Sequence, residues 1–170
     1  TAYALAFLIR KCSGDDSNPL KVVGLTSPRN EAFVKSLGVY DQVVLYDNIE
    51  SQIQASGGGG PARVVDMSGN GQVLRRIIAA APETKCSLVG ATHVEQAGAS
   101  AGSPEKMPGT FFFAPSHAVS IVKKIGNEAF QDLISKDWAS FTSHVDTAKW
   151  CNIDKRIGAD AILSTWKQAL

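Results

Sequence analysis

Short valine-rich apolar runs alternate along this chain with stretches whose apolar residues recur at helical spacing, and this alternation constrains the fold more than any other feature. The runs are too short for amphipathic helices and are bounded by turn residues, so they are predicted to be strands. Alternating strands and helices are typical of βαβ units, in which helices cover a parallel sheet. We therefore expect an α/β fold with a Rossmann-like parallel sheet flanked by helices. The predicted strands are residues 20–25, 42–46, 62–67, 85–91 and 110–114.

The predicted helices have apolar stripes and, in places, recognisable ends. Ser27 can cap a helix after the first predicted strand, with Phe33, Val34 and Leu37 facing inward. Asn127 can cap a long helix near the carboxyl end, whose aromatic residues we expect in the core. The other expected inward residues are Val73, Leu74, Ile77 and Ile78; Ala118, Ile121, Val122 and Ile125; Phe130, Leu133, Ile134, Trp138, Phe141 and Val145; and Ile162 and Trp166.

Composition narrows the class of partner. The chain has 170 residues, of which 44% are hydrophobic, and a net charge of +1. These values fit one domain over residues 1–170 with a real core. No clustered basic run marks a nucleic-acid or lipid-surface partner, so we expect a small-molecule ligand and a cytoplasmic protein that does not enter a membrane. Cys12, Cys86 and Cys151 lie far apart without a CxxC pair, which predicts buried or half-buried free thiols rather than disulfides or a zinc site.

Polar and small residues follow four of the predicted strands. In an open parallel sheet, ligands bind beyond the carboxyl ends of the strands, so these segments are candidates for a binding site. Their glycines allow close approach, and their hydroxyl and amide groups can bond a ribose or a phosphate. The alternative is that serines and asparagines there merely cap helices, and glycines merely make turns. The segments are 24–30 (GLTSPRN), 66–71 (DMSGNG), 90–93 (GATH) and 113–117 (FAPSH).

The first of these segments carries the most information. In a dinucleotide-binding fold, an acid at the end of the second strand favours NAD, whereas a nearby arginine favours NADP. Here Thr26, Ser27 and Arg29 offer two hydroxyls and a guanidinium, and no carboxylate ends the strand. This combination suits a phosphate dianion through charge-assisted hydrogen bonds. The competing interpretation is that Arg29 is an ordinary solvated residue at a helix start.

Four motifs in order give the chain a family resemblance. Residues 22–47 resemble the second strand, helix and third strand of the cofactor domain of medium-chain dehydrogenases and quinone reductases. TAY at 1–3, TSPRN at 26–30, VDMSGN at 65–70 and GATH at 90–93 resemble an uncharacterised branch of that superfamily, over most of the chain but loosely after residue 115. The resemblance implies NADP as cofactor. The cofactor-binding residues that we expect are Thr26, Ser27, Arg29, Asn30, Asp66, Met67, Ser68, Gly69, Asn70, Gly90, Ala91 and Thr92.

The chain also departs from that family. It has no glycine-rich turn for the pyrophosphate, no separate catalytic domain, and Asn30 where many quinone reductases have a lysine. His93 and His117 follow predicted strands and could donate protons, although a structural role is the simpler interpretation, and the catalytic residues are left open. We expect the NADP-binding portion of an oxidoreductase for a small carbonyl, enone or quinone-type substrate. The alternatives are a non-catalytic nucleotide-sensing or interaction module and another Rossmann-like enzyme such as a methyltransferase.

The strand order predicts an incomplete sheet. In the Rossmann order 3-2-1-4-5-6, the first strand lies between the second and the fourth, and a helix follows it. Residues 1–12 read as that helix and begin with Thr1 rather than Met, so the first strand is expected to precede the chain. We therefore expect a missing amino-terminal half, a peptide from another chain, or a homodimer. The Gly, Ala and Ser-rich stretch at 93–108 is expected to be a mobile loop.

Overall fold

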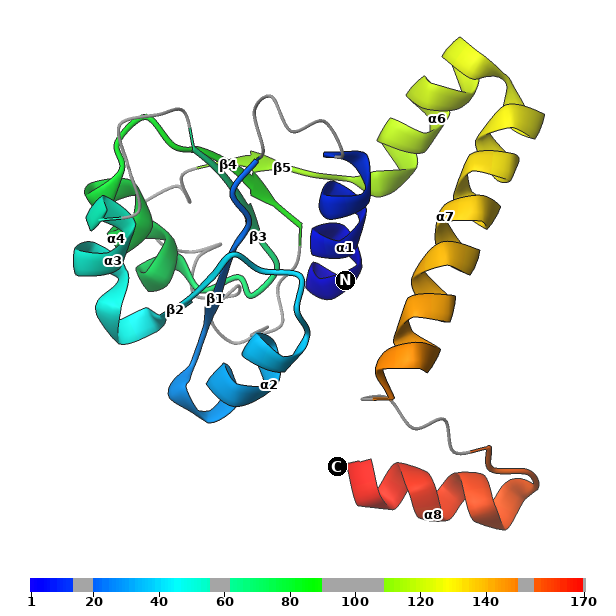
Figure 1. Ribbon diagram of the computed structural model, residues 1–170. Helices are drawn as coiled ribbons and strands as arrows, with labels where there is room; N and C mark the ends of the chain where they lie inside the picture. The colour runs from blue at the N-terminus through cyan, green and yellow to red at the C-terminus, as the bar shows by residue number, and fades with distance from the viewer. Residues whose placement is uncertain (14–19, 56–61, 90–108, 150–154, 170) are drawn as a thin grey trace, which may run out of the picture.

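The computed structural model describes residues 1–13, 20–55, 62–89, 109–149 and 155–169, and within them the chain is an α/β protein (Figure 1). Helices and short parallel strands alternate over the first part, and three helices follow. The elements in order are α1 (Ala2–Cys12), β1 (Val23–Thr26), η1 (Pro28–Asn30), α2 (Glu31–Ser36), β2 (Gln42–Leu45), η2 (Tyr46–Asn48), α3 (Ile49–Ala55), β3 (Arg63–Asp66), α4 (Gly71–Ala80), β4 (Lys85–Leu88), β5 (Thr110–Phe111), α6 (Ala114–Ile125), α7 (Asn127–Ala148) and α8 (Ala159–Ala169).

The strands form two separate parallel sheets. β1 pairs with β2 in one sheet, and β3, β4 and β5 pair in that order in the other. Within the described residues, β1 and β3 do not pair with each other. This arrangement matches the Rossmann order with its central strand left out, which confirms the expectation of a parallel sheet that is incomplete between these two strands.

Helices α3 and α4 connect the two sheets on one side. They pack against each other, and Figure 1 draws them next to one another. Arg76 of α4 donates to both carboxylate oxygens of Glu50 in α3, from Nε at 2.5 Å and from Nη2 at 2.6 Å. The fully buried side chains include Ile49 of α3 and Leu74 of α4, so this helix pair also has an apolar centre.

Helix α1 packs on a core that belongs to the β1–β2 half. Tyr3 and Ala6 of α1 are buried with Leu37 and Val39, and the partly buried Phe141 of α7 packs against the same cluster. The ring centroids of Tyr3 and Phe141 are 5.3 Å apart in an edge-to-face arrangement, which is the favourable geometry for an aromatic pair. One face of α7 is therefore anchored to α1.

Polar contacts hold the carboxyl-terminal end of α1. Arg10 Nε donates to the Val39 carbonyl at 3.2 Å, and the guanidinium also pairs with Asp41. Asp41 in turn accepts from the Val22 amide at 2.7 Å. Burial opposes ionisation of Asp41, but these hydrogen bonds and the nearby cations together lower the pKa of its carboxyl.

The helix after β1 is shorter than expected. It begins at Glu31 after the 3₁₀ turn η1, and the side chain of Ser27 does not cap that turn. Leu37 is buried as predicted, but Phe33 is 47% exposed, so the prediction that Phe33 faces inward is wrong. The six residues of α2 form fewer than two turns, so its apolar positions cannot all face the core.

The apolar residues of the last three helices are largely exposed, contrary to the prediction that they form core. Trp138 of α7 is 64% exposed and Trp166 of α8 is 66% exposed. Apolar periodicity indicates an apolar face on a helix, but it does not say what covers that face. Nor does Asn127 cap α7: the N-cap position is Gly126, and no side chain bonds there. The other exposed apolar residues of these helices include Val119, Ile121, Ile125, Leu133, Ile134, Ile162 and Leu163.

The expectation for the cysteines can be compared with the structure. Cys86 is a buried free thiol as expected, whereas Cys12 is exposed because it lies in the last turn of α1; Cys151 lies outside the described residues. No cluster of three or more potential metal-ligating side chains forms in the described part of the chain. None of the described helices combines the length and the apolar character that a membrane crossing requires.

Candidate nucleotide site at the strand ends

At the end of β1 the chain turns sharply and presents polar side chains. Thr26 is 6% exposed and closes the strand, while the half-buried Ser27 is still extended, with φ −81° and ψ 159°. Pro28 begins the 3₁₀ turn, where its fixed φ is favourable. The Asn30 amide closes this turn by donating to the Ser27 carbonyl at 3.0 Å. Local sequence thus places Arg29 on a short, defined turn at the edge of the sheet.

The polar groups of this turn are available to a ligand. Within the described part of the chain, the Ser27 hydroxyl caps no amide and the exposed Arg29 pairs with no carboxylate. The nearest acid in sequence, Glu31, accepts instead from Lys35 at 2.6 Å, one helical turn further on. A guanidinium and a hydroxyl without internal partners can together bind a phosphate dianion.

At the end of β3, in contrast, the polar groups bond one another. Asp66 is 9% exposed, and its Oδ1 accepts from the Ser68 amide at 2.9 Å, the Ser68 hydroxyl at 2.9 Å and the Gly69 amide at 3.2 Å. Gly69 adopts φ +70°, a conformation that glycine reaches without a steric penalty. One carboxylate oxygen therefore fixes the whole loop after the strand.

Asn70 completes this loop by capping α4. Its Oδ1 accepts from the amides of Gln72 at 3.1 Å and Val73 at 3.2 Å, and these are two donors that the helix itself cannot satisfy. The interpretation of Asn70 as a helix cap is therefore confirmed. Ser68 contributes in the same way, since its hydroxyl also accepts from the Asn70 amide at 3.2 Å.

The second carboxylate oxygen of Asp66 differs from the first. Oδ2 is buried, and no group of the described residues donates a hydrogen bond to it. The charge of Asp66 acts on two neighbours from other strands: burial raises the pKa of the Tyr46 hydroxyl, and Asp66 raises it further, and the same two causes raise the pKa of the Cys86 thiol. The end of β2 and the strand β4 thus both lie within the electrostatic reach of Asp66.

Not all of the residues predicted for the site can be placed. Thr26, Ser27, Arg29 and Asn30 lie together on the turn after β1, and Asp66 to Asn70, with the half-buried Met67, lie together after β3. Gly90, Ala91 and Thr92 lie outside the described residues, as do His93 and the stretch predicted to be mobile.

Two residues near Asp66 were missed by the sequence analysis, and one candidate histidine has a structural contact. Tyr46 directly follows β2, so the rule that directs attention to strand ends could have found it, whereas Cys86 lies within an apolar strand and gives no such signal. The exposed His117 stacks on Phe112, with ring centroids 4.4 Å apart. This contact favours the structural interpretation of His117.

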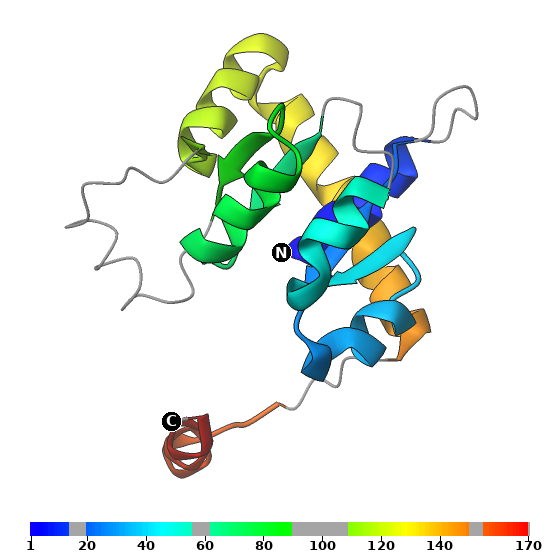
Figure 2. The same ribbon diagram turned by 90° about the vertical axis from the view of Figure 1, so that its left-hand side faces the viewer.

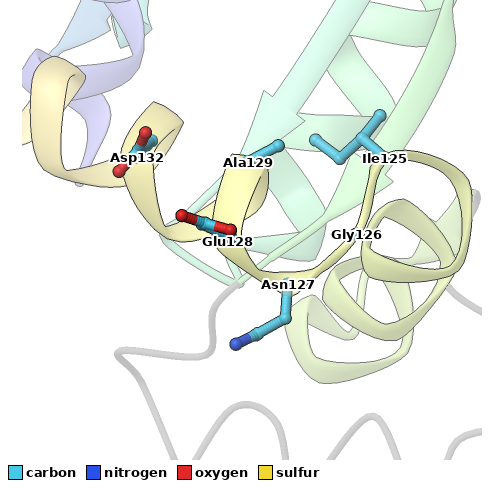
Figure 3. Close-up of a pocket in the computed structure, with 6 residues that line it drawn as sticks. All are labelled: Ile125, Gly126, Asn127, Glu128, Ala129 and Asp132. Carbon is cyan, nitrogen blue, oxygen red and sulfur yellow. The ribbon is translucent and has the colours of Figure 1, made fainter.

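A shallow hollow elsewhere on the molecule lies at the corner between α6 and α7 (Figure 3). Its lining includes the carboxylates of Glu128 and Asp132 and no cation. This charge disfavours a nucleotide phosphate, and we assign the hollow no part in the nucleotide site.

The fold and its strand ends define an α/β protein with Rossmann-like parallel pairing that is open at its centre. The chain belongs to the DUF2855 family, described as a protein of unknown function, whose family model matches residues 1–170. No curated protein and no solved structure matches the chain.

Proposed function

We propose that this chain is the NADP-binding portion of an oxidoreductase that acts on a small carbonyl, enone or quinone-type substrate. The observation that carries the proposal is the end of β1, where the Ser27 hydroxyl caps no amide and the Arg29 guanidinium pairs with no carboxylate among the described residues. In dinucleotide-binding sheets the adenosine ribose meets the end of the strand at this position. Because a guanidinium stands there instead of a carboxylate, the site favours a ribose that carries a 2′-phosphate.

Each residue of the turn has a chemical role in this proposal. The planar fork of Arg29 donates two hydrogen bonds to phosphate oxygens, and Ser27 donates a third from its hydroxyl. The side-chain carboxamide of the exposed Asn30 supplies a neutral donor at the rim, since its backbone amide already bonds the Ser27 carbonyl. The buried Thr26 anchors the turn to the sheet, so that these donors are held in place before the ligand arrives.

The end of β3 suits the part of the same ligand that leads toward nicotinamide, including the ribose on that side. Asp66 Oδ2 accepts no hydrogen bond from the described residues, and a ribose hydroxyl of the cofactor supplies the missing donor once the loop that covers this buried oxygen moves aside. Bound NADPH would supply the hydride, while the residues of this chain bind and orient it. The order of the TSPRN and VDMSGN motifs resembles an uncharacterised branch of the medium-chain dehydrogenase and quinone reductase superfamily, and this resemblance supports the same assignment.

Calorimetry with NADPH, NADH and adenosine 2′,5′-bisphosphate tests the proposal. We expect NADPH to bind more tightly than NADH, and Arg29→Ala to weaken NADPH about ten- to a hundredfold, because one charge-assisted contact contributes roughly 1.5 to 3 kcal/mol. NADH binding should change little in the same variant. Lys123→Ala, which removes an exposed cation from α6, is the matched control and should change neither affinity.

Two outcomes would contradict this proposal. Equal affinity of the unmutated protein for NADH and NADPH would remove the role of the turn after β1. A similar loss of affinity in Arg29→Ala and Lys123→Ala would show that only net charge matters. The short bisphosphate carries the decisive phosphate without the nicotinamide half, so it reports on the turn alone.

The exposed aromatic residues favour a second candidate function, a non-catalytic nucleotide-sensing or interaction module. Trp138 and Trp166 are the kind of residue that dominates protein interfaces. Oxidation of NADPH in the presence of enones and quinones separates the two candidates. The reductase requires turnover by the native polypeptide, whereas the module binds the nucleotide and leaves it unchanged.

A further inference from the structure

One edge of β3 has no strand beside it among the described residues. The Ala62 carbonyl accepts from the Lys85 amide at 3.1 Å, and the Asp66 carbonyl accepts from the Val89 amide at 2.8 Å, so both face β4. Along a strand, the amide and carbonyl of one residue point to the same side, and the side alternates from residue to residue. The backbone groups of Arg63 and Val65 therefore point away from β4. Within the described residues, neither amide donates to a strand on that side of β3.

The same alternation applies to β1. Val22 uses both its amide and its carbonyl to bond Asp41, which directly precedes β2. Gly24 and Thr26 consequently face β2, and Val23 and Leu25 face the opposite edge. Among the described residues, the edge of β1 that faces away from β2 and the edge of β3 that faces away from β4 both lack a partner strand. The outer strands β2 and β5 end the two sheets, whereas in the Rossmann order the open edges of β1 and β3 face each other across one missing strand.

The first residue of α1 lies close to the gap between the open edges of β1 and β3, at the end where a parallel strand in that gap would finish. Figure 1 shows α1 running opposite to β1, so that its first residue lies toward the end of the sheet where β1 finishes. In Figure 2 the marked N-terminus stands between the half that contains β3, β4 and α4 and the half that contains β1 and α2. A segment joined to Thr1 can therefore enter the space between the sheets after a short turn.

We propose that the polypeptide segment joined to Thr1 forms a strand between β1 and β3, parallel to both, and unites the two sheets into one. Helix α1 then becomes the crossover from this strand to β1, the right-handed connection usual in parallel sheets. This inference goes beyond the proposed function, because it concerns a polypeptide partner for the sheet and holds whether or not a nucleotide binds.

The neighbouring strands specify the character of the inserted segment. β1 and β3 each have four residues, so a match requires a segment of about the same length. A central parallel strand is covered on both faces, so the segment is apolar throughout and rich in Val, Ile and Leu. Val65, now 40% exposed in the middle of β3, becomes covered when the segment is in place.

Amide hydrogen exchange at residue resolution tests the proposal. It compares chain 1–170 with the native polypeptide isolated from its natural source. In chain 1–170 the amides of Arg63 and Val65 should exchange quickly and those of Val64 and Asp66 slowly. In the native polypeptide all four should be slow, with Arg63 and Val65 slowed at least about a hundredfold. The Val64 and Asp66 amides are internal controls because β4 already protects them.

Each result of this experiment decides the proposal. Protection of Arg63 and Val65 that is independent of protein concentration supports a segment of the same polypeptide. Protection that rises with concentration, together with a dimer in sedimentation, assigns the strand to a second copy and overturns the proposal. Fast exchange in the native polypeptide also overturns it. None of these results depends on nucleotide. The proposed function can therefore fail while the inserted strand is supported, and the inserted strand can be overturned while NADPH still binds.

A pair of proline substitutions gives an independent readout. Val65→Pro removes an amide that faces the open edge, whereas Val64→Pro removes one that faces β4. Val65→Pro should lower the thermal midpoint of the native polypeptide much more than that of chain 1–170. Val64→Pro should lower both. Equal effects of Val65→Pro on the two forms would contradict the inserted strand.

Discussion

The ends of β1 and β3 occupy equivalent places in a parallel fold, yet they use their polar residues in opposite ways. After β3, Asp66, Ser68 and Asn70 satisfy one another and the start of α4. After β1, Ser27 and Arg29 make no such internal bonds within the described residues. The comparison teaches that residue type alone does not mark a ligand site. What matters is which donors and acceptors remain after the chain has bonded itself.

Removing the centre of the self-bonded loop should have the largest effect. Asp66→Ala deletes the acceptor of three hydrogen bonds, and we expect the free energy of unfolding to fall by about 2 to 4 kcal/mol. Urea unfolding measures the change. Asp66→Asn keeps an oxygen acceptor at the same place and should lose less. A loss below about 1 kcal/mol in Asp66→Ala would mean that the loop does not depend on this carboxylate.

A pair of smaller substitutions sharpens the comparison directly. Asn70→Ala removes the cap of α4 and should cost about 1 kcal/mol of stability, while Ser27→Ala removes a hydroxyl that caps nothing and should cost almost none. NADPH binding should respond in the opposite way, with Ser27→Ala the more damaging of the two. Thermal unfolding and calorimetry on both variants check the pattern. If Ser27→Ala destabilised the fold as much as Asn70→Ala, the contrast between the two strand ends would fail.

The smallest effect concerns the ion pair that joins α3 to α4. Its hydrogen bonds from Arg76 lower the pKa of Glu50 from 4.5 to about 2. Because the pKa in the folded protein is lower, the pair stabilises the fold above pH 4.5, and this contribution is lost as the pH falls toward 2. Glu50→Gln should flatten the pH dependence of the thermal midpoint in this window, and added salt should weaken the wild-type effect because the pair is exposed.

A matched glutamate provides the control for this experiment. Glu83 is exposed and forms no ion pair with the described residues, so Glu83→Gln should leave the acid limb of the curve unchanged. Identical curves for wild type and Glu50→Gln would show that α3 and α4 hold together by apolar packing alone.

Much of the α/β part could be predicted from the sequence because its signals are local. The strands β1, β2 and β3 lie within or beside their predicted ranges, since valine-rich runs bounded by turn residues have few alternative structures. Leu74 and Ile77 are buried as their helical spacing predicts. The prediction that Trp138 and Trp166 lie in the core was wrong because apolar spacing marks one face of a helix but does not say whether another part of the chain covers that face.

The candidate site divides in the same way. The cap formed by Asn70 could be anticipated because it depends on residues two and three positions away. The grouping of Tyr46 and Cys86 around Asp66 could not, because it depends on how three separate strands are placed. Whether Arg29 is used by the fold itself is likewise a property of the whole structure, and no motif states it.

Each parallel ladder here joins strands that follow one another in the chain: β1 with β2, β3 with β4, and β4 with β5. Such local pairings close early in folding because little chain entropy is lost in forming them. A strand between β1 and β3 would complete its pairing later than these ladders. A ribosome makes an amino-terminal segment first, but its second neighbour, β3, is synthesised only after β1 and β2. The first strand to be made would then be the last to be completed, and until that moment it would leave an open edge that a chaperone or a second chain could occupy.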